Sequence, residues 1–445
     1  MPRRPHNRPG FYVEMTQPRT EKSEKQPKAP RGFVRRFFAV LGPGFITGAA
    51  DDDPSGIVTY SIAGAQLGTS MLWTAMLTFP LMAAVQMMCA RIGMVTGTGL
   101  AAALQKKIPR PLLAMVGLAL FAANTVNVGA DLSGMADVAN LLSGVPSGFW
   151  VMGFGTAIIF ATIFFKYNAI ASTLKWLAVS LFAYVITAFL VHPDWSRILS
   201  ATFLPSWPTN HDQWSTLVAI LGTTISPYLF FWQTSQEVEL KKARGQRTVA
   251  SRQGGDPQEL NDRAFDVGVG AFFSNLIMYF IILTTALTLH RNGITQLDSS
   301  KDAVQALAPL AGHLAALLYA VGLIGVGFLA IPTMAGSAAY VFVEIFGFRQ
   351  GLDEKLHRAR AFYGILVLSI LFGMALTFTS IKPMAALFWC AVINGLVAPF
   401  VLVGILLVAC DQMLMHNQRS SFLARITVGI TTAAMFVAGI AIFLV

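Results

Sequence analysis

Charged residues are scarce in this chain of 445 residues, at 12% of the total, about half the share that a soluble domain usually carries. Long polar linkers are also absent after residue 36, so the sequence does not divide into separate soluble domains. Apolar residues make up 55% of the chain, which excludes a disordered protein. The composition therefore indicates an all-α polytopic membrane protein.

Cysteine is nearly absent: the chain has three, Cys89, Cys390 and Cys410, and each lies in an apolar run. This excludes a disulfide scaffold and a Cys-rich metal site, and we expect all three to be buried as small apolar residues. No His-Glu-x-x-His or Gly-x-Ser-x-Gly motif occurs, so an intramembrane hydrolase has no support. We therefore expect neither an enzyme nor a bound cofactor.

The net charge of +10 is concentrated in residues 1–36, which hold ten Lys and Arg, three Glu and six Pro. This composition predicts a disordered basic cytoplasmic tail, and it lacks the apolar core of a signal peptide. A basic tail ahead of a first membrane helix acts on topology and attracts anionic lipid. We expect the lipid bilayer, and no nucleic acid, as its partner.

Apolar stretches of about 20 residues, the length that crosses a bilayer, recur along the rest of the chain. With the amino terminus in the cytoplasm, 27 Lys and Arg lie on the cytoplasmic side and 4 on the other, which satisfies the positive-inside rule. The carboxyl terminus then lies outside a bacterial-type plasma (inner) membrane, and 236–264 is a solvated cytoplasmic loop. We predict eleven spans: 38–66, 71–92, 112–141, 149–166, 169–191, 214–235, 265–289, 313–346, 361–380, 384–410 and 424–445.

Two of these spans contain residues that interrupt a membrane helix. Each intramembrane charge costs about 2.5–3.5 kcal/mol, and a proline removes a backbone donor. Each span is therefore predicted to be two half-helices that meet at an unwound segment lining a cavity. The interruptions are Asp51–Asp52–Asp53–Pro54–Ser55–Gly56 in span 38–66 and Gly222–Thr223–Thr224–Ile225–Ser226–Pro227–Tyr228 in span 214–235.

The two breaks occupy matching positions, because Pro227 follows Pro54 by 173 residues and each broken span opens a set of five. This pattern is typical of a secondary transporter built from inverted repeats. We predict the first five-helix repeat over 37–192, the second over 193–411, and an eleventh transmembrane helix in 412–445.

The breaks offer only oxygen ligands to an ion between them. Asp53, directly before the proline, is the best candidate ligand. Asp51 and Asp52 cannot point the same way, because successive helical residues turn by about 100°. Oxygen ligation suits hard ions such as Mg²⁺, Ca²⁺, Mn²⁺ or Na⁺. Besides freed carbonyls, the second break supplies the hydroxyls of Thr223, Thr224, Ser226 and Tyr228.

At this point the motifs resemble those of the NRAMP family of divalent metal transporters, over residues 38–410. The resemblance rests on Gly42–Pro43–Gly44, Asp53–Pro54–Ser55–Gly56, Ala130–Asp131–Leu132 and Ser226–Pro227–Tyr228. It implies a LeuT-like fold of eleven transmembrane helices in two inverted five-helix repeats, with helices 1 and 6 broken. Together with the oxygen donors above, it predicts a metal site of Asp53, Gly56, Thr223, Ser226, Tyr228 and Asn394, with Asp51, Asp52 and Asp131 nearby.

Several positions depart from the family's motifs. The family's Asp-Pro-Gly-Asn ends in Gly56 here, which loses an amide ligand. Its Met-Pro-His reads Ser226–Pro227–Tyr228, which loses a thioether and a histidine. Two glutamates of the third helix are replaced by Asn124 and Gly134, and span 361–380 has no arginine, where metal-transporting members carry basic residues.

The remaining intramembrane polar residues have plainer interpretations. We expect Asn124 and Asn127 to make helix–helix hydrogen bonds. Asp131 is expected beside the site, and Asn394, next to Gly395, could act as an outer ligand in a closed state.

The departures resemble the NRAMP-related magnesium transporters, a branch in which uptake is thought to be uncoupled from protons. They imply a wider oxygen-lined site that suits hydrated Mg²⁺, with Mn²⁺ as the next candidate, and few groups to relay a proton. Two alternatives remain open, a sodium-coupled symporter of a small solute and a proton-coupled transporter of Mn²⁺ or Fe²⁺. The ion is the substrate rather than a cofactor, and the oligomeric state is open, with a monomer as the simplest case.

Overall fold

The structure is a computed structural model that describes residues 43–165, 179–352, 354–379 and 381–445. The predicted basic tail lies outside these residues, as does the first part of the predicted fifth span. Within the described ranges the chain is helical, without a strand. The long helices are α4 (Trp73–Thr96), α6 (Arg110–Ser143), α7 (Ser147–Phe164), α14 (Pro257–Thr288), α17 (Ala315–Phe346), α18 (Arg360–Leu376), α19 (Pro383–Cys410) and α20 (Phe422–Leu444).

Two further helices are broken at the predicted places. The first consists of α2 (Pro43–Asp51) and α3 (Pro54–Leu67), and the second of α11 (His211–Thr224) and α12 (Pro227–Ala243). Shorter helices connect the long ones: α5 (Leu100–Leu104), α9 (Phe182–Leu190), α10 (Trp195–Phe203), α13 (Val249–Arg252), α15 (Ser300–Val304) and α16 (Ala308–Ala311).

Eight helices of the described chain, with α11 and α12 taken as one, are long and apolar enough to cross a membrane. The other three predicted spans correspond to the broken α2–α3 helix, to α9 at the end of the fifth span, and to α18, an apolar helix of 17 residues. On α7, α18 and α20 the side chains of Phe160, Phe372 and Phe443 are more than half exposed, which suits contact with hydrocarbon rather than water. The prediction of an all-α polytopic membrane protein is confirmed.

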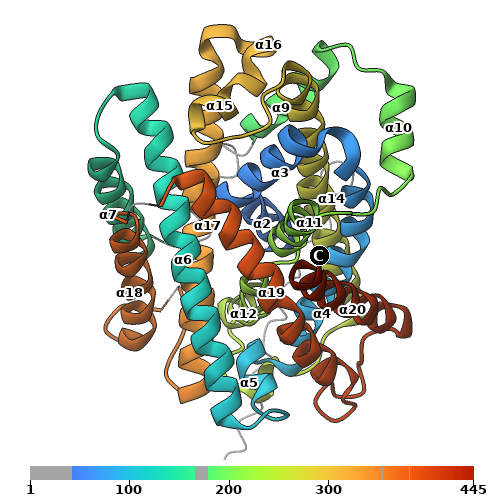
Figure 1. The fold of residues 1–445 in the computed structure, drawn as a ribbon. Coiled ribbons are helices and arrows are strands. Elements are labelled where there is room, and N and C mark those ends of the chain that lie inside the picture. Colours follow the sequence, from blue (N-terminus) through green and yellow to red (C-terminus); the bar gives the residue numbers. More distant parts are fainter. Residues whose placement is uncertain (1–42, 166–178, 353, 380) are drawn as a thin grey trace, which may run out of the picture. The chain divides into compact units, whose positions relative to one another are not determined.

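The broken α2–α3 helix lies in the middle of the described helices, with α11, α14, α17 and α19 around it (Figure 1). α14 packs against both halves, and glycines permit the close approach. A Cβ on Gly48 would lie 2.5 Å from the carbonyl carbon of Gly270. One on Gly64 would lie 2.0 Å from the Thr285 Oγ1. The two half-helices are therefore held by the same long neighbour.

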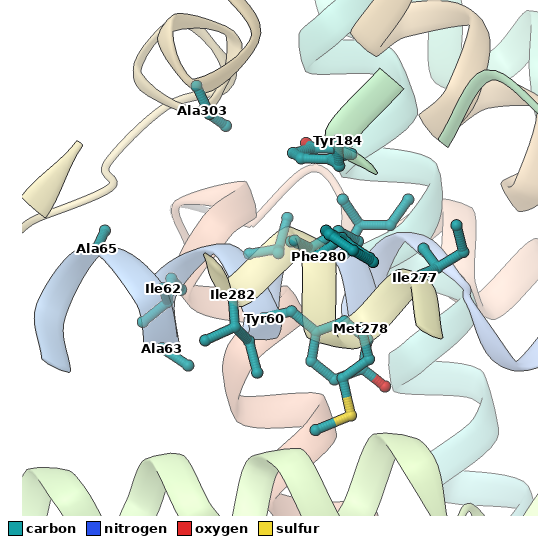
Figure 2. Packing of buried hydrophobic residues seen from close by; sticks show 14 of the residues in the cluster. Tyr60, Ile62, Ala63, Ala65, Tyr184, Ile277, Met278, Phe280, Ile282 and Ala303 are labelled. Atoms are coloured by element: carbon teal, nitrogen blue, oxygen red, sulfur yellow. The ribbon is translucent and has the colours of Figure 1, made fainter. Parts of the chain in front are cut away.

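Apolar packing fixes the α3 half in place. Figure 2 shows Tyr60 and Ile62 of α3 beside Met278 and Ile282 of α14, with Tyr184 of α9 nearby. All five side chains are buried in one cluster. Close-packed interiors of this kind resist small displacements, so α3 offers a rigid support for the residues at its amino end.

The first half of the other broken helix, α11, packs against α19 through two glycines. A Cβ on Gly222 would lie 2.1 Å from the carbonyl oxygen of Ala391, and one on Gly395 would lie 2.5 Å from that of Val218. The two backbones therefore touch directly at this level. As a result Asn394, which precedes Gly395, lies beside the end of α11.

Part of the predicted solvated loop 236–264 is instead helical and packed, so that prediction is wrong for these residues. α12 continues to Ala243 and α14 already begins at Pro257. Lys241 is 5% exposed, because its ammonium donates to carbonyl oxygens of Met94, Arg252 and Gly254 at 2.6, 2.7 and 2.6 Å. The three carbonyl oxygens take the place of the water molecules that would solvate this ammonium in an exposed loop.

The cysteine prediction holds for two of the three residues. Cys89 and Cys390 are buried, whereas Cys410 is exposed. Cys410 is the last residue of α19, where the helix leaves the packed region.

Substituting Gly222 by Ala should destabilise the protein, because the new methyl group would collide with the α19 backbone. Overpacking of this kind costs about 1–3 kcal/mol. The expected result is a lower midpoint in a thermal unfolding scan of the detergent-solubilised protein. Gly364→Ala is the matched control, since a Cβ there has no heavy atom within 4 Å. An unchanged midpoint for Gly222→Ala would show that α11 and α19 are not in backbone contact.

Candidate metal site

The break in the first helix is organised by Asp53. α2 ends at Asp51 and α3 begins at Pro54, whose missing N–H costs nothing at a first helical position. Asp53 is extended (φ −68°, ψ 170°) and caps α3: its Oδ1 accepts the N–H of Gly56 and the hydroxyl of Ser55, both at 2.7 Å. The cap aims one carboxylate into the gap between the half-helices.

The break in the second helix lies between Thr224 and Pro227 and is satisfied differently. The Ser226 hydroxyl lies 2.8 Å from the carbonyl oxygen of Gly222 and 2.7 Å from that of Thr223, so it donates back to the end of α11. Both lone pairs of that hydroxyl stay available to an ion. The neighbouring Thr224 hydroxyl donates to its own helix, at Ile220, over 2.6 Å.

Tyr228 connects the two breaks. Its hydroxyl lies 3.3 Å from Asp53 Oδ2 and 3.3 Å from the carbonyl oxygen of Ala50, and it can donate to either. Tyr228 has none of its surface exposed. A residue of α12 therefore contacts both sides of the break between α2 and α3.

Gly56 leaves a space that oxygen atoms surround. A Cβ at this position would lie 3.0 Å from Thr223 Oγ1, 3.4 Å from Asp53 Oδ1 and 3.5 Å from the carbonyl oxygen of Asp51. The Thr223 hydroxyl is buried without a hydrogen-bond partner among the described residues. Oxygens of both broken helices thus face one small volume, which a side chain at position 56 would fill.

Two residues of α6 complete the surroundings of Asp53. Asn127 Nδ2 lies 3.5 Å from Asp53 Oδ2 and 3.2 Å from the sulfur of Met334, so Asn127 reaches the site rather than only a neighbouring helix. Asn124 makes the expected helix–helix bond, to the Met334 carbonyl oxygen at 3.0 Å. Asp131 is fully buried, lies within electrostatic reach of Asp53 and has the backbone N–H of Ser55 as a neighbouring donor.

The other predicted residues separate into two groups. Asn394 is 1% exposed and its Oδ1 has no partner among the residues described, which leaves that oxygen available beside the end of α11. Asp51 and Asp52 face α14 instead: both contact the Ser274 hydroxyl, Asp51 Oδ2 at 2.8 Å and Asp52 Oδ1 at 3.1 Å. They are near the candidate site but belong to a different set of contacts.

The side chains around the two breaks offer mainly oxygen ligands. Several of these oxygens are buried and have no hydrogen-bond partner among the described residues. Leaving such a group unpaired costs about 1–3 kcal/mol, so buried polar atoms of this kind are usually bound to an ion or to water. Across the described ranges no three His, Cys, Asp or Glu side chains converge to hold a metal. Any ion here would therefore rest on one or two carboxylates and neutral oxygens. Among the described residues the unpartnered oxygens are Thr223 Oγ1, Asn127 Oδ1 and Asn394 Oδ1.

A buried ion network, not found from the sequence, lies at the start of α2. Arg263 pairs with Glu237 of α12 at 2.8 Å and with Asp266 at 2.6 Å. Asp266 Oδ2 also accepts the N–H of Gly44 at 2.8 Å. The network ties α2, α12 and α14 together. Arg263 was counted among the solvated loop residues because its partners lie far away in the sequence.

Two half-helix pairs that meet around buried oxygens define a class, the LeuT-like membrane transporters, and solved structures agree on the fold. The Eremococcus coleocola manganese transporter superimposes with a TM-score of 0.73, covering 92% of this chain and 87% of that one at 18% identity. MhsT, solved with L-phenylalanine, gives 0.57 over 90% and 97% of the two chains at 13% identity. The predicted LeuT-like fold is confirmed.

The sequence comparisons define the family. The model described as natural resistance-associated macrophage protein-like matches residues 44–445, so the chain belongs to the NRAMP family of divalent metal transporters, which are not enzymes. The divalent metal cation transporter MntH of Aeromonas hydrophila is 26% identical over 399 residues, 87% of this chain and 91% of the relative. MntH of Caldanaerobacter subterraneus is 25% identical over 428 residues, 92% and 94% of the two chains.

Substituting Arg263 by Met should destabilise the protein strongly, because Glu237 and Asp266 would stay buried without their partner. Breaking a buried pair in this way costs about 3–5 kcal/mol. Arg244→Met is the matched control, since Arg244 pairs with Glu259 at a site where the arginine is 56% exposed, and such pairs contribute about 0–1 kcal/mol. Thermal unfolding should show a large drop only for Arg263→Met, and equal midpoints would contradict the buried network.

Proposed function

We propose that this protein transports divalent cations, Mg²⁺ before Mn²⁺, by alternating access and without coupled proton movement. The observation that carries the proposal is the convergence of oxygens from both broken helices on the space beside Gly56. The membership of the NRAMP family supports divalent cations in general. The preference for Mg²⁺ and the lack of coupling rest on the side chains described above.

The loss of two ligands favours a partly hydrated ion. Mg²⁺ bonds its ligands at about 2.0–2.1 Å and gives up its waters reluctantly. Gly56 and Ser226 supply neither an amide nor a thioether, so fewer protein groups compete with the waters of the ion. The three oxygens around the missing Cβ of Gly56 lie 3.0 to 3.5 Å from that point, which is too short for a water between an ion there and these oxygens. The retained waters would therefore lie on the other sides of the ion.

The sulfur of Met334 lies near the site, which bears on the alternative of Mn²⁺ transport. Met334 of α17 accepts the Asn127 amide at 3.2 Å, and the same amide nitrogen lies 3.5 Å from Asp53 Oδ2, so Asn127 links the sulfur to Asp53. In addition, the relatives and the solved neighbour are named for divalent metal and manganese. Manganese transport is therefore the second candidate. Against it, the Met334 sulfur is already engaged, whereas the family's missing thioether would have come from position 226.

Neutral contacts at the expected proton path support uncoupled transport. α6 and α18 meet through the hydroxyls of Thr125 and Ser369, 3.0 Å apart. A Cβ on Gly134 would lie 2.8 Å from Leu387, an apolar neighbour. A relay needs a chain of titratable groups inside the membrane. The buried Arg263 network is elsewhere, between α12 and α14, and its charges are paired.

A cavity approaches the site along α3, α11 and α19. Its volume is about 390 Å³ and its lining includes Gln66, Asp212 and Thr216. Thr216 precedes Thr223 by two turns of α11, a distance of about 10 Å. Asp53 itself is 1% exposed, so the ion position is closed in this structure. We propose that the cavity is the outer vestibule, with the amino terminus cytoplasmic and the carboxyl terminus outside a plasma (inner) membrane.

The membrane potential would then drive uptake without a coupling ion. Moving one charge inward gains about 2.3 kcal/mol per 100 mV, and a divalent ion gains twice that. The alternative is a sodium-coupled symporter of a small solute, and MhsT, solved in complex with L-phenylalanine, has a similar fold. The three adjacent carboxylates of the first break oppose it, because they would repel the carboxylate of such a substrate.

Asp53→Asn should abolish Mg²⁺ uptake into proteoliposomes, by at least about tenfold, while the protein stays folded, because asparagine also caps helices well. Asp194→Asn is the matched control, since Asp194 caps α10 at an exposed position. A fluorescent Mg²⁺ indicator inside the vesicles measures uptake under an inside-negative potential. Wild-type flux in Asp53→Asn would disprove the ligand role. A pH indicator that reports proton influx matched to the Mg²⁺ flux would disprove uncoupled transport.

Gly56→Asn should lower Mg²⁺ uptake and raise the preference for Mn²⁺, because it restores an amide ligand and reduces the space for water. Gly56→Ala separates the two effects: it fills the space, with its Cβ 3.0 Å from Thr223 Oγ1, but adds no ligand. We expect both variants to lose Mg²⁺ flux and only Gly56→Asn to shift the Mn²⁺ to Mg²⁺ flux ratio, by about threefold or more, given the 1–3 kcal/mol typical of one ligand interaction. An identical ratio in both variants would contradict this role.

A further inference from the structure

We propose that Asp51 and Asp52, together with Ser274 of α14, form a second divalent-cation site next to the Asp53 site. The proposal rests on the proposed function and assigns the step that follows binding at Asp53. Its ligands would be the carboxylates of Asp51 and Asp52 and the hydroxyl of Ser274. The ion is of the same class as the transported one, a hard divalent cation.

The geometry brings these three side chains to one point. Asp51 is the last residue of α2, and Asp52 lies in the unwound segment after it. Asp51 Oδ2 and Asp52 Oδ1 lie 2.8 and 3.1 Å from the same Ser274 oxygen. A hydroxyl carries one proton and cannot donate to both carboxylates at once. With both carboxylates ionised, one of them contacts the Ser274 oxygen without an intervening proton, and a cation bound by the three groups would relieve that contact.

A second observation, independent of the clustering, points to a ligand. Asp51 Oδ1 is buried on a side chain with none of its surface exposed, and it has no hydrogen-bond partner among the described residues. Asp52 is 5% exposed. An ionised oxygen without a donor in a membrane interior is expensive, and such oxygens are normally paired or bound to a metal.

Charge compensation distinguishes this pair from the structural carboxylates nearby. Glu237 and Asp266 are equally buried, but both pair with Arg263. No ion pair of the described chain includes Asp51 or Asp52. Two adjacent carboxylates carry the charge of one divalent ion, so a single bound cation neutralises the pair.

Asp51 and Asp52 make different contacts from Asp53, but they directly precede it in the chain. Asp53 takes its hydrogen bonds from Ser55 and Gly56 and, over longer distances, from Tyr228 and Asn127, whereas the side chains of Asp51 and Asp52 take theirs from Ser274. The carbonyl oxygen of Asp51 nevertheless faces the space beside Gly56. An ion leaving Asp53 toward α2 would meet Asp51 and Asp52 next, so the pair would hold it before release.

Counting bound Mn²⁺ tests the proposal on the full-length purified protein. Free Mn²⁺ gives an electron paramagnetic resonance signal that bound Mn²⁺ loses, and added Mg²⁺ should restore it by competition. We expect the wild type to bind two Mn²⁺ ions per chain. Asp53→Asn should retain one, and Asp51→Asn combined with Asp52→Asn should retain the other.

Ser274→Ala supplies a milder test if the double variant does not fold. It should weaken the second Mn²⁺ by about tenfold, the effect of losing one interaction of about 1.4 kcal/mol, and leave the first unchanged. Ser337→Ala is its control, since the buried Ser337 hydroxyl donates to its own helix at Thr333 over 2.7 Å. This control should leave both sites unchanged.

The outcomes separate the two proposals. One bound ion in the wild type, retained in the Asp51 and Asp52 double variant, would overturn the second site and leave the proposed function intact. Unchanged binding of the second Mn²⁺ ion in Ser274→Ala would overturn the second site as well. No bound Mn²⁺ in the wild type, or no loss in Asp53→Asn, would overturn the proposed function itself.

Discussion

The arrangement depends on one constraint: where a helix breaks inside a membrane, the freed backbone groups and polar side chains must satisfy one another, because lipid offers no hydrogen bonds. Asp53 meets this need by capping α3, and Tyr228 links that cap to the second break. The two oxygens of Asp53 are held unequally. Oδ1 has two donors at 2.7 Å, whereas Oδ2 has contacts of 3.3 and 3.5 Å. Oδ2 is therefore the less constrained oxygen, whereas Oδ1, which faces the space beside Gly56, would serve both the α3 cap and an ion bound there.

Features that depend on neighbouring residues in the chain could be predicted from the sequence, whereas contacts between distant segments could not. Proline and consecutive aspartates disturb a helix locally, so both breaks and the place of Asp53 between the half-helices could be predicted. Long apolar runs likewise predicted the spans that the structure describes. The place of Asn127 beside Asp53 could not be predicted. An asparagine in a membrane helix indicates a hydrogen bond but not its partner, and the distance to Asp53 depends on how α6 packs. The burial of Arg263 could not be predicted either. An arginine in a polar segment is expected to be solvated unless its partners on α12 and α14 are known.

Buried charge in this chain is of two kinds. Arg263 neutralises Glu237 and Asp266, and the result is a fixed connection between three helices. Asp53 and Asp131 have no cationic side chain against them in the described chain. A paired charge contributes to the architecture, whereas an unpaired one in the membrane needs a mobile partner. This contrast sets the region around the first break apart from the Arg263 network, and it supports the proposed metal site on physical grounds that do not depend on the family.

For the proposed transport of Mg²⁺, selectivity would follow from the size of side chains as much as from their chemistry. Gly56 and Ser226 stand in place of an amide and a thioether, so the site offers fewer direct ligands. A site of this kind would not strip a strongly hydrated ion completely, and it would gain little from an ion that prefers soft ligands. It would discriminate instead by charge and by the fit of a partly hydrated ion. The same loss of ligands would keep binding weak enough for the ion to leave, which the proposed voltage-driven uptake requires because no second ion supplies energy for release.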